Sequence, residues 1–472
     1  MNLPNLKEAQ KRTNKEIKII KNDYKVPSDM KNIGKNKKYY LKTYGCQMNV
    51  HDSELLKAML EDMSFSETDT MEDADIILLN TCAIRENAHN KMFGFLGRVK
   101  HLKEDKPDII CGICGCMAQE ENVVESIRKK YKWVDIVFGT HNLHKLPNIL
   151  KEAIDEKRQQ VEVFSIEGDV YENIPVKRDS KYKAWVNIMY GCDKFCTYCI
   201  VPYTRGKQRS RMPEDILNEV KDLVENGYKE VTLLGQNVNA YGKDLGINYT
   251  MGDLLEATAK TGVERIRFVT SHPWDFDDKM IDVIAKYNNI MPYIHLPLQS
   301  GSDRILKLMG RKYSKNEYLT LFKKIKKTIP NVSITTDIIV GFPGESDEDF
   351  EETLDVVKKC KYDSAFTFIF SPREGTPASK MEDNIPLNVK EERLHKLNEL
   401  VNKYSLKANQ KYLGKTVKVL LDSVSFKNQD LLAGYTDTMK LVNVKAPKNK
   451  IGQIVLVKIN NVQTWSMDGE IV

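Results

Sequence analysis

The sequence predicts an α/β protein with three parts: an N-terminal parallel α/β domain, a partial (β/α)6-type barrel and a small C-terminal antiparallel β-barrel. Between residues 37 and 370, short apolar runs rich in β-branched residues alternate with segments of helical length and period, which is typical of parallel sheets covered by helices. After Gly414 the helical period stops, and short strands alternate with turns of Gly, Pro, Asn and Lys. The length of 472 residues allows about three domains.

The composition is typical of a globular protein, with 41% hydrophobic and 29% charged residues. No apolar run approaches the roughly 20 residues of a membrane span, and the N-terminus has no apolar signal segment. Nine cysteines without an export signal indicate a reducing compartment, where cysteines are more often metal ligands or catalytic groups than disulfides. We therefore expect a cytoplasmic protein without a membrane segment. An exported disulfide scaffold is excluded.

The positive charge is concentrated at the two ends of the chain. The net charge is +6, yet residues 1–38 hold 11 Lys and Arg against 4 Asp and Glu, and residues 405–472 hold 10 against 5. The chain between these ends is therefore acidic overall, and the basic ends favour contact with nucleic acid. Residues 1–36 are predicted to be a mostly disordered arm with a short helix near residues 8–21. The arm is either a solvated extension or a nucleic-acid contact.

The first domain is predicted over residues 37–154. Its four strands are expected to be parallel, because a helical segment separates each strand from the next. The strands are predicted at residues 39–43, 74–79, 108–113 and 134–138, and the helices near residues 52–62, 85–103, 119–130 and 142–152. Residues 155–182 are polar and are predicted to link this domain to the next.

The second domain is predicted over residues 183–404. Its first helix begins at Pro213, has Glu214 and Asp215 in its first turn and ends at Gly227, as expected of helix termini. Six strands and their helices make six βα-type units, which is enough for a partial barrel and short of the full eight. The strands are predicted at residues 185–188, 230–234, 265–270, 293–298, 333–340 and 364–370, and the helices near residues 277–286, 303–308, 315–328 and 347–359.

The third domain is predicted over residues 405–472. A long helix with a polar face, over residues 388–412, leads into it. Short strands separated by turn residues then predict a small barrel of about 60 residues without helices. These strands are predicted at residues 416–421, 431–435, 440–444 and 454–462.

Three cysteines follow the first barrel strand, as Cys192, Cys196 and Cys199 in the run GCDKFCTYC. Loops at the carboxyl ends of barrel strands carry active sites. Three thiolates on one tight loop can bind three irons of a [4Fe–4S] cluster and leave the fourth iron open to a reacting molecule. A zinc site would need a fourth ligand, and a redox pair would leave one cysteine unexplained. Both stay open as alternatives, as does burial in a core.

A second set of three cysteines is spread over the N-terminal domain. Cys46, Cys82 and Cys116 each follow a predicted strand, at intervals of about one βα unit. The carboxyl ends of parallel strands share one edge of a sheet, so this spacing predicts a second cluster site with three thiols. Cys111 and Cys114 form a C-x-x-C pair beside it. Cys114 is either buried or a substitute for Cys116.

Other candidate residues lie in loops that follow predicted barrel strands, at residues 235–237, 271–273, 299–301 and 341–345. Such loops carry ligand contacts in barrels, although their Gly and Pro residues are also ordinary turn residues. The candidates for cofactor binding are Tyr198, Gly235, Gln299 and Gly341. Arg205, Arg209 and Arg211 form a basic patch after the cysteine loop, which is either a substrate-phosphate contact or a solvated face.

Three further residues are expected to have structural roles. Cys360 ends a predicted helix and has no partner nearby in the sequence. His141 and His144 form an H-x-x-H pattern on a predicted loop without a matching cysteine, so a surface or capping role is expected. We expect no side-chain acid–base pair.

Three runs in the N-terminal domain resemble the methylthiotransferases: YGCQMN at residues 44–49, NTCAIREN at 80–87 and GCMAQ at 115–119. The run GCDKFCTYCIVPYTRG at residues 191–206 resembles the radical S-adenosylmethionine (SAM) core of that family, and the C-terminal strands resemble a TRAM domain, a small RNA-binding module. The resemblance covers about residues 38–470. Residues 80–87 and 91–97 are more similar to the tRNA-modifying branch than to the ribosomal-protein branch.

The resemblance implies an enzyme that replaces the C2 hydrogen of N6-isopentenyladenosine, next to the tRNA anticodon, with a methylthio group. It also implies two [4Fe–4S] clusters, each held by one set of three cysteines. One SAM would yield a 5′-deoxyadenosyl radical, a second would methylate the sulfur carried by the N-terminal cluster, and a partner protein would donate electrons. The C2–H bond has no useful acidity, so cofactor radical chemistry suits the reaction better than acid–base catalysis.

Two other functions stay open from the sequence. The same chemistry could modify a ribosomal-protein side chain, or the clusters could be structural in a non-catalytic RNA-binding protein. Fully ligated clusters would favour the latter, whereas three cysteines in each set favour open irons and catalysis. RNA contacts by the basic ends predict an affinity that falls steeply with salt.

Overall fold

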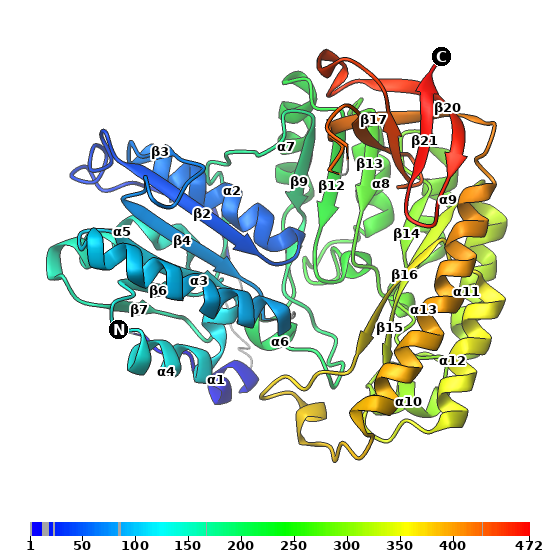
Figure 1. The fold of residues 1–472 in the computed structure, drawn as a ribbon, viewed down its shortest axis with the longest axis horizontal. Helices are drawn as coiled ribbons and strands as arrows, with labels where there is room; N and C mark the ends of the chain where they lie inside the picture. Colours follow the sequence, from blue (N-terminus) through cyan, green and yellow to red (C-terminus); the bar gives the residue numbers. More distant parts are fainter. Residues whose placement is uncertain (1, 12–17, 22–23, 84–85, 167, 427) are drawn as a thin grey trace. The chain divides into compact units, whose positions relative to one another are not determined.

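The computed structural model describes residues 2–11, 18–21, 24–83, 86–166, 168–426 and 428–472 (Figure 1). The chain divides into two compact units. Unit 1 comprises Met1–Asp179, Asn187–Phe195 and Cys199–Arg211, and unit 2 comprises Ser180–Val186, Cys196–Tyr198 and Met212–Val472. The chain therefore passes between the units more than once, including twice within the cysteine loop.

Unit 1 is built on a six-stranded sheet in the order β3-β2-β4-β5-β6-β7, in which every pair is parallel. Its strands are β2 (Lys38–Tyr44), β3 (Ser66–Glu67), β4 (Ile76–Thr81), β5 (Ile110–Gly115), β6 (Ile136–Phe138) and β7 (Gln160–Glu162). The four predicted strands and their parallel order are confirmed. Two short strands at the edges, β3 and β7, were not predicted.

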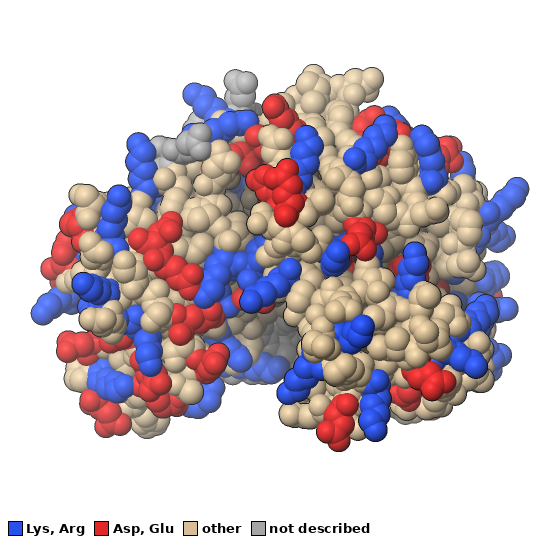
Figure 2. Space-filling view, turned by 90° about the horizontal axis from the view of Figure 1, so that it is seen from above, with Lys and Arg blue, Asp and Glu red and all other residues tan. Residues whose placement is uncertain are grey.

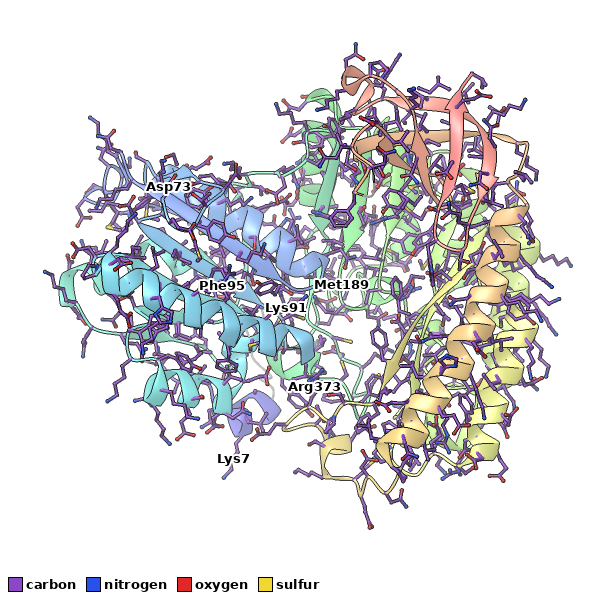
Figure 3. All side chains as sticks on the ribbon, in the orientation of Figure 1. Lys7, Asp73, Lys91, Phe95, Met189 and Arg373 are labelled. Carbon is purple, nitrogen blue, oxygen red and sulfur yellow. The ribbon has the colours of Figure 1, made fainter. Side chains whose placement is uncertain are left out.

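Helices cover both faces of this sheet and create two cores (Figure 1). Helices α2 (Gln47–Asp62) and α5 (Leu146–Glu156) bury their apolar side chains on one face. Helices α3 (Glu86–Asp105) and α4 (Glu121–Lys130) do so on the other, where Phe95 of α3, labelled in Figure 3, is one of the buried side chains. The central strands are buried on both sides, which explains why their sequences are continuous apolar runs.

The N-terminal arm contains regular structure among its described residues. Helix α1 spans Leu6–Lys11, and β1 (Ile19–Lys21) pairs in parallel with β8 (Val170–Glu172). Part of the helix predicted near residues 8–21 lies outside the described residues, at 12–17. The predicted linker, residues 155–182, contributes β7 and β8, so much of it belongs to sheets of unit 1.

Unit 2 contains the six strands of the partial barrel, in two groups ordered β13-β12-β9 and β14-β15-β16. A parallel bridge between Ile266 and Ile290 links the groups. The strands are β9 (Lys183–Asn187), β12 (Glu230–Leu234), β13 (Arg265–Phe268), β14 (Tyr293–His295), β15 (Ser333–Val340) and β16 (Ser364–Ile369). The predicted six-strand arrangement is confirmed.

Helices lie between and outside these strands. The predicted helices are present as α7 (Pro213–Glu225), α9 (Asp278–Lys286), α10 (Asp303–Leu308), α11 (Lys315–Thr328) and α12 (Asp347–Cys360), while α8 (Met251–Ala259) was not predicted. Helices α11, α12 and α13 (Leu387–Gln410) lie side by side, and α13 packs on β15 and β16 (Figure 1). One face of these two strands is thereby covered.

The C-terminal strands close into a barrel in the order β17-β18-β19-β21-β20. They are β17 (Thr416–Val424), β18 (Leu432–Thr436), β19 (Leu441–Val444), β20 (Ile454–Val462) and β21 (Met467–Ile471). The predicted barrel is confirmed with two corrections. A fifth strand, β21, was missed because its sequence MDGEI is largely polar, and it pairs in parallel with β19, so the barrel is not wholly antiparallel.

The surface carries both signs of charge. On the face drawn in Figure 2, basic and acidic side chains are interspersed. Among the described residues, no helix combines the length and the apolar composition needed to cross a bilayer.

Candidate functional site

Three cysteines of unit 1 lie where neighbouring strands end. Cys46 follows β2 and is the N-cap residue of α2, Cys82 follows β4, and Cys116 follows β5 at the start of a short 3-10 helix, η1 (Cys116–Gln119). Strands β2, β4 and β5 are adjacent in the sheet, so the three residues share its carboxyl edge. Cys82 and Cys116 are buried and Cys46 is partly exposed.

The electrostatics show that these thiols are close to one another. A hydrogen bond from Cys82, together with the charge of Arg205 and backbone N–H groups at the start of α2, lowers the pKa of Cys46 to about 6 against the effect of burial. Burial raises the pKa of Cys116, and the nearby Cys46 adds to that effect while Arg205 opposes it. The environment therefore favours a thiolate at Cys46, and a thiolate is the form that binds metal.

Arg205, which follows the second cysteine set in the sequence, belongs to unit 1 and contacts the N-terminal thiol set. Its Nε donates to Sγ of Cys116 at 3.1 Å, and its Nη2 donates to Oδ2 of Asp52, on α2, at 2.5 Å. Arg205 and Asp52 are 4% and 1% exposed. The guanidinium group thus bridges a buried carboxylate and a candidate cluster ligand. No sequence pattern pointed to Asp52.

The other two arginines of the predicted basic patch are also buried. Arg209 donates from Nη1 to the carbonyl of Gly168 at 2.8 Å. Arg211 donates from Nε and Nη2 to the two carboxylate oxygens of Glu172, each at 2.7 Å. The solvated-face interpretation is therefore wrong, because all three guanidinium groups are bound inside the protein. A contact with substrate phosphate stays a prediction.

Two buried asparagines tie the loops of Cys46 and Cys82 together. Asn49 accepts from the backbone N–H of Cys46 at 3.3 Å through Oδ1, and its Nδ2 donates to Oδ1 of Asn80 at 3.0 Å. Asn80, two residues before Cys82, donates in turn to the carbonyl of Asn49 at 2.9 Å and to Ser53 at 3.0 Å. Both asparagines are fully buried, so the network fixes the positions of the two loops.

A glycine precedes a cysteine in both candidate sites. Gly115, before Cys116, has φ +93°, and a Cβ there would meet the side-chain oxygen of Asn80 at 2.3 Å. Gly191, before Cys192, has φ +69°, and a Cβ would meet the carbonyl of Lys207 at 2.1 Å. The repeated Gly-Cys pair is a sequence signal for the tight turn that presents each thiol.

The two cysteines of the C-x-x-C pair are core residues. Cys111 lies in the core under α3 and α4, where burial raises its pKa to about 12. Cys114 lies in the opposite core, where burial also raises its pKa. Both are on β5 itself, whereas Cys116 lies beyond the strand. This placement favours Cys116 as the third thiol.

The cysteine loop of the barrel gives its sulfurs hydrogen-bond donors. In unit 1, the backbone N–H of Lys194 donates to Sγ of Cys192 at 3.4 Å. In unit 2, Nη1 of the buried Arg311 donates to Sγ of Cys196 at 3.4 Å. Cys199 is partly exposed. Donors to cluster sulfurs are one way in which a protein sets a cluster's reduction potential.

The rim loops of unit 2 hold polar atoms suited to a polar ligand such as SAM. Among the described residues, Oε1 of Gln236, Oδ1 of Asn237 and Oγ of Ser271 are buried without a hydrogen-bond partner, at the carboxyl ends of β12 and β13. Buried polar atoms are ordinarily paired, so three orphans on two neighbouring loops point to a missing ligand.

The predicted cofactor-binding residues lie on this rim. Gly235 follows β12, and Tyr198 packs against a small apolar cluster that includes Phe342. Gln299 adopts φ +69° and bridges to β15, and Gly341 adopts φ +68° after β15. Each position follows a barrel strand or the cysteine loop, as the sequence predicts.

The remaining candidates differ in outcome. Cys360 ends α12 and is buried, as expected. His144 stacks on Tyr171 at 3.8 Å, but His141 is 7% exposed and both its ring nitrogens lack partners, so a surface role for His141 is wrong. Burial, with Arg209 and Arg205 nearby, holds the pKa of His141 well below its usual value.

A single-metal site receives no support. Across the described part of the chain, no three His, Cys, Asp or Glu side chains converge as ligands of one metal ion. A structural zinc site needs four side chains that converge on one ion. In a [4Fe–4S] cluster, by contrast, each thiolate binds a different iron. None of the nine cysteines forms a disulfide, and Cys46, Cys82 and Cys116 share one edge of the sheet.

Three family models match the chain. The Radical SAM superfamily matches residues 186–357, the Uncharacterized protein family UPF0004 matches residues 38–139, and the TRAM domain matches residues 410–472. The first and second of these ranges each contain one set of three cysteines.

Curated relatives match almost the whole chain. The chain is 60% identical over 470 residues to the tRNA-2-methylthio-N(6)-dimethylallyladenosine synthase of Bacillus cytotoxicus. The match covers 99% of this chain and 92% of that protein. The proteins of that name from Bacillus subtilis and Halalkalibacterium halodurans are 58% and 56% identical, over 92% and 87% of their lengths.

A solved structure shares the fold at low identity. The radical S-adenosylmethionine methyltransferase TsrM from Kitasatospora setae, solved with cobalamin and a [4Fe-4S] cluster, matches with a TM-score of 0.52 and 13% identity. The match covers 73% of this chain and 77% of that one.

Proposed function

The chain belongs to the family of tRNA-2-methylthio-N(6)-dimethylallyladenosine synthases, and from this premise we propose how its residues exchange the C2 hydrogen of N6-isopentenyladenosine, next to the anticodon, for a methylthio group. The protein is a radical SAM methylthiotransferase with two [4Fe–4S] clusters, and SAM is both its methyl donor and its radical source. Its substrate is tRNA.

One observation carries the assignment of the N-terminal cluster. Three thiols lie at one sheet edge, each after a different strand, and there Cys82 donates to Cys46 and Arg205 donates to Cys116. The donor set fits a cluster with one open iron. The proposed ligands are Cys46, Cys82 and Cys116 for this cluster, and Cys192, Cys196 and Cys199 for the barrel cluster. When bound, the clusters supply the electron that cleaves SAM and the sulfur that is inserted.

The surrounding residues position these ligands and keep water away. Cys116 packs with Ala83 and Ile200, while Tyr203 covers the same small cluster. A dry environment strengthens each charge-assisted bond inside it. We propose that the orphaned rim atoms of Gln236, Asn237 and Ser271, together with the predicted candidates, hold SAM: Tyr198, Gly235, Gln299 and Gly341.

The wider organisation follows from the same premise. The proposed domains are residues 37–154, 183–404 and 405–472, preceded by the basic arm. We propose that the protein acts in the cytoplasm, where tRNA is found and where its nine cysteines, none of which forms a disulfide, stay reduced. We also propose that a separate protein donates the electrons.

Cysteine variants of the reconstituted enzyme test the proposal. Cys192→Ala is expected to abolish 5′-deoxyadenosine formation. Cys82→Ala is expected to retain SAM cleavage and lose methylthiolated nucleoside, because only the N-terminal cluster is removed. Cys111→Ala is the matched control, since it replaces a buried cysteine of the same domain. Equal product from Cys82→Ala and Cys111→Ala would contradict the ligand assignment.

Nucleoside mass spectrometry of tRNA tests the substrate. A strain without this protein is expected to accumulate the dimethylallyl nucleoside without its methylthio group. A methylthio mass gained by a ribosomal protein instead would favour the alternative substrate, and no 5′-deoxyadenosine at all would favour a structural role for the clusters.

A further inference from the structure

Two phenylalanines on β16, the last strand of the partial barrel, are exposed although large apolar side chains on barrel strands are ordinarily buried. Phe366 and Phe368 of β16 are 54% and 50% exposed. Their neighbour Thr367 points the other way and donates to Asn398 of α13 at 2.6 Å. Because α13 covers the outer face of the strand, the alternation of side chains places both phenyl rings on the inner face of the partial barrel.

The register of the sheet shows which residues share this inner face. Asp337 is paired with Phe366 and Ile339 with Phe368. His295 of β14 lies two strands away on the same face, where its Nε2 is 3.2 Å from Oδ2 of Asp337 and its ring meets Phe366 edge-on at 6.0 Å. We call these five residues the inner aromatic face. It consists of three apolar side chains, Ile339, Phe366 and Phe368, beside the polar pair His295 and Asp337.

The inner aromatic face leads to the cysteine loop. Ile339 packs against the apolar cluster of Phe342 and Phe370, and Tyr198 of the cysteine loop packs against the same cluster. Tyr198 lies between Cys196 and Cys199. Within unit 2, the inner aromatic face is therefore connected through this apolar cluster to Tyr198.

We propose that the inner aromatic face binds the dimethylallyl-bearing adenine of tRNA, with the base and its five-carbon tail packed on Phe366 and Phe368. The inference rests on the proposed function and names the part of the enzyme that recognises the existing modification. Exposed aromatic rings next to a reaction centre are suited to an unstacked base, whose faces and tail are apolar. Two rings are too small a patch for a protein partner.

Binding of two anticodon stem-loop RNAs to the full-length reconstituted enzyme tests the inference. One RNA carries the dimethylallyl group and the other carries plain adenosine. Wild type is expected to prefer the modified RNA about tenfold or more, because apolar groups of this size discriminate at that level. The double variant Phe366→Ala/Phe368→Ala is expected to lose this preference. Phe366→Leu, which keeps an apolar side chain, is expected to lose only part of it.

The control variant is Leu387→Ala, which removes an apolar side chain that is 63% exposed at the start of α13. It is expected to keep the preference of wild type. A double variant that still prefers the modified RNA, or a wild type without a preference, would overturn the inference. Failure of the proposed function is distinguished from failure of this inference by a different result: the wild-type enzyme would form no methylthio product from the modified RNA.

Discussion

At the residue scale, Arg205 shows how one side chain can serve two roles. The guanidinium group neutralises the buried Asp52 and donates to Cys116, so it holds a charge inside the protein and orients a thiol at once. Only the planar fork of arginine can make both bonds in this geometry. From the sequence, Arg205 belongs to a basic patch that is either a phosphate contact or a solvated face, because the buried partner Asp52 lies more than 150 residues away in the chain.

Replacement of Arg205 is expected to empty the N-terminal cluster site. Arg205→Gln leaves Asp52 buried without a partner, which costs about 3–5 kcal/mol of unfolding free energy. The measurement uses a Cys192→Ala background, in which only the N-terminal set keeps its three cysteines. In this background, Arg205→Gln is expected to lower the iron content and the electron paramagnetic resonance signal of the reduced protein. Arg158→Gln, which breaks an exposed pair with Glu156, is the control and is expected to change neither. Wild-type iron content in Arg205→Gln would contradict the prediction.

Glu54 of α2 makes the stability of unit 1 depend on pH. Burial raises its pKa to about 7, although the N–H of Asp179 at 3.1 Å and the charge of Arg178 act against the shift. The folded protein therefore binds this proton more tightly than the unfolded chain, whose glutamates titrate near 4.3. The free energy of unfolding is expected to fall as the pH rises from about 4.5 to 7, because the buried Glu54 carboxyl then loses its proton and becomes charged.

Glu54→Gln is expected to remove this dependence. Glutamine imitates the protonated acid, so at pH 8 the variant is expected to exceed wild type by on the order of 2 kcal/mol and to match it near pH 4.5. Urea unfolding at the two pH values measures the difference. Glu72→Gln, at an exposed position, is the control. An equal response of both variants to pH would exclude Glu54 as the cause.

At the element scale, the asparagine network joins the start of α2 to the end of β4. Asn80→Leu is expected to leave Asn49 and Ser53 without partners and to lower the unfolding free energy by about 1–3 kcal/mol. The loops of Cys46 and Cys82 would then lose their fixed spacing, so the reconstituted variant is expected to retain less iron. Asn316→Leu, on the exposed face of α11, is the control for both measurements. Unchanged iron retention would show that the network only stabilises the fold.

The success of prediction also differed between elements for physical reasons. Strands such as β12 and β15 were predicted with their observed bounds, because both are short runs rich in β-branched and apolar residues. Strands β3, β7 and β21 were missed because they are short or largely polar, and β7 and β21 each contribute only one residue, Val161 and Met467, to a hydrophobic core. The spacing of the six cysteines predicts two ligand sets, and that assignment stays a prediction, whereas Asp52, Asn49, Asn80 and Arg311 act through contacts that only the folded chain creates.

At the scale of the whole molecule, the basic C-terminal barrel is expected to make RNA binding depend on salt. Lys418 and Lys458 lie on neighbouring strands, β17 and β20, and are both exposed. Lys418→Glu/Lys458→Glu is expected to weaken tRNA binding and to reduce the slope of log affinity against log salt by roughly 1.4–1.8, since two phosphate contacts are removed.

A second double variant separates this effect from overall charge. Lys221→Glu/Lys323→Glu makes the same change in net charge on helices α7 and α11, where the lysines are also exposed. It is expected to leave the slope nearly unchanged. Equal slopes for the two double variants would show that the barrel lysines make no special phosphate contacts.

The origin of the N-terminal thiols in three distant segments has a consequence for how a cell produces this enzyme. Cys46, Cys82 and Cys116 reach one sheet edge only after β2, β4 and β5 have paired, which requires the chain to be synthesised and folded at least as far as Cys116. The cysteines of the barrel loop, in contrast, leave the ribosome almost together. Iron donors must therefore reach a folded N-terminal domain before its site can be loaded, and cysteines that have already been synthesised must stay reduced until the domain has folded.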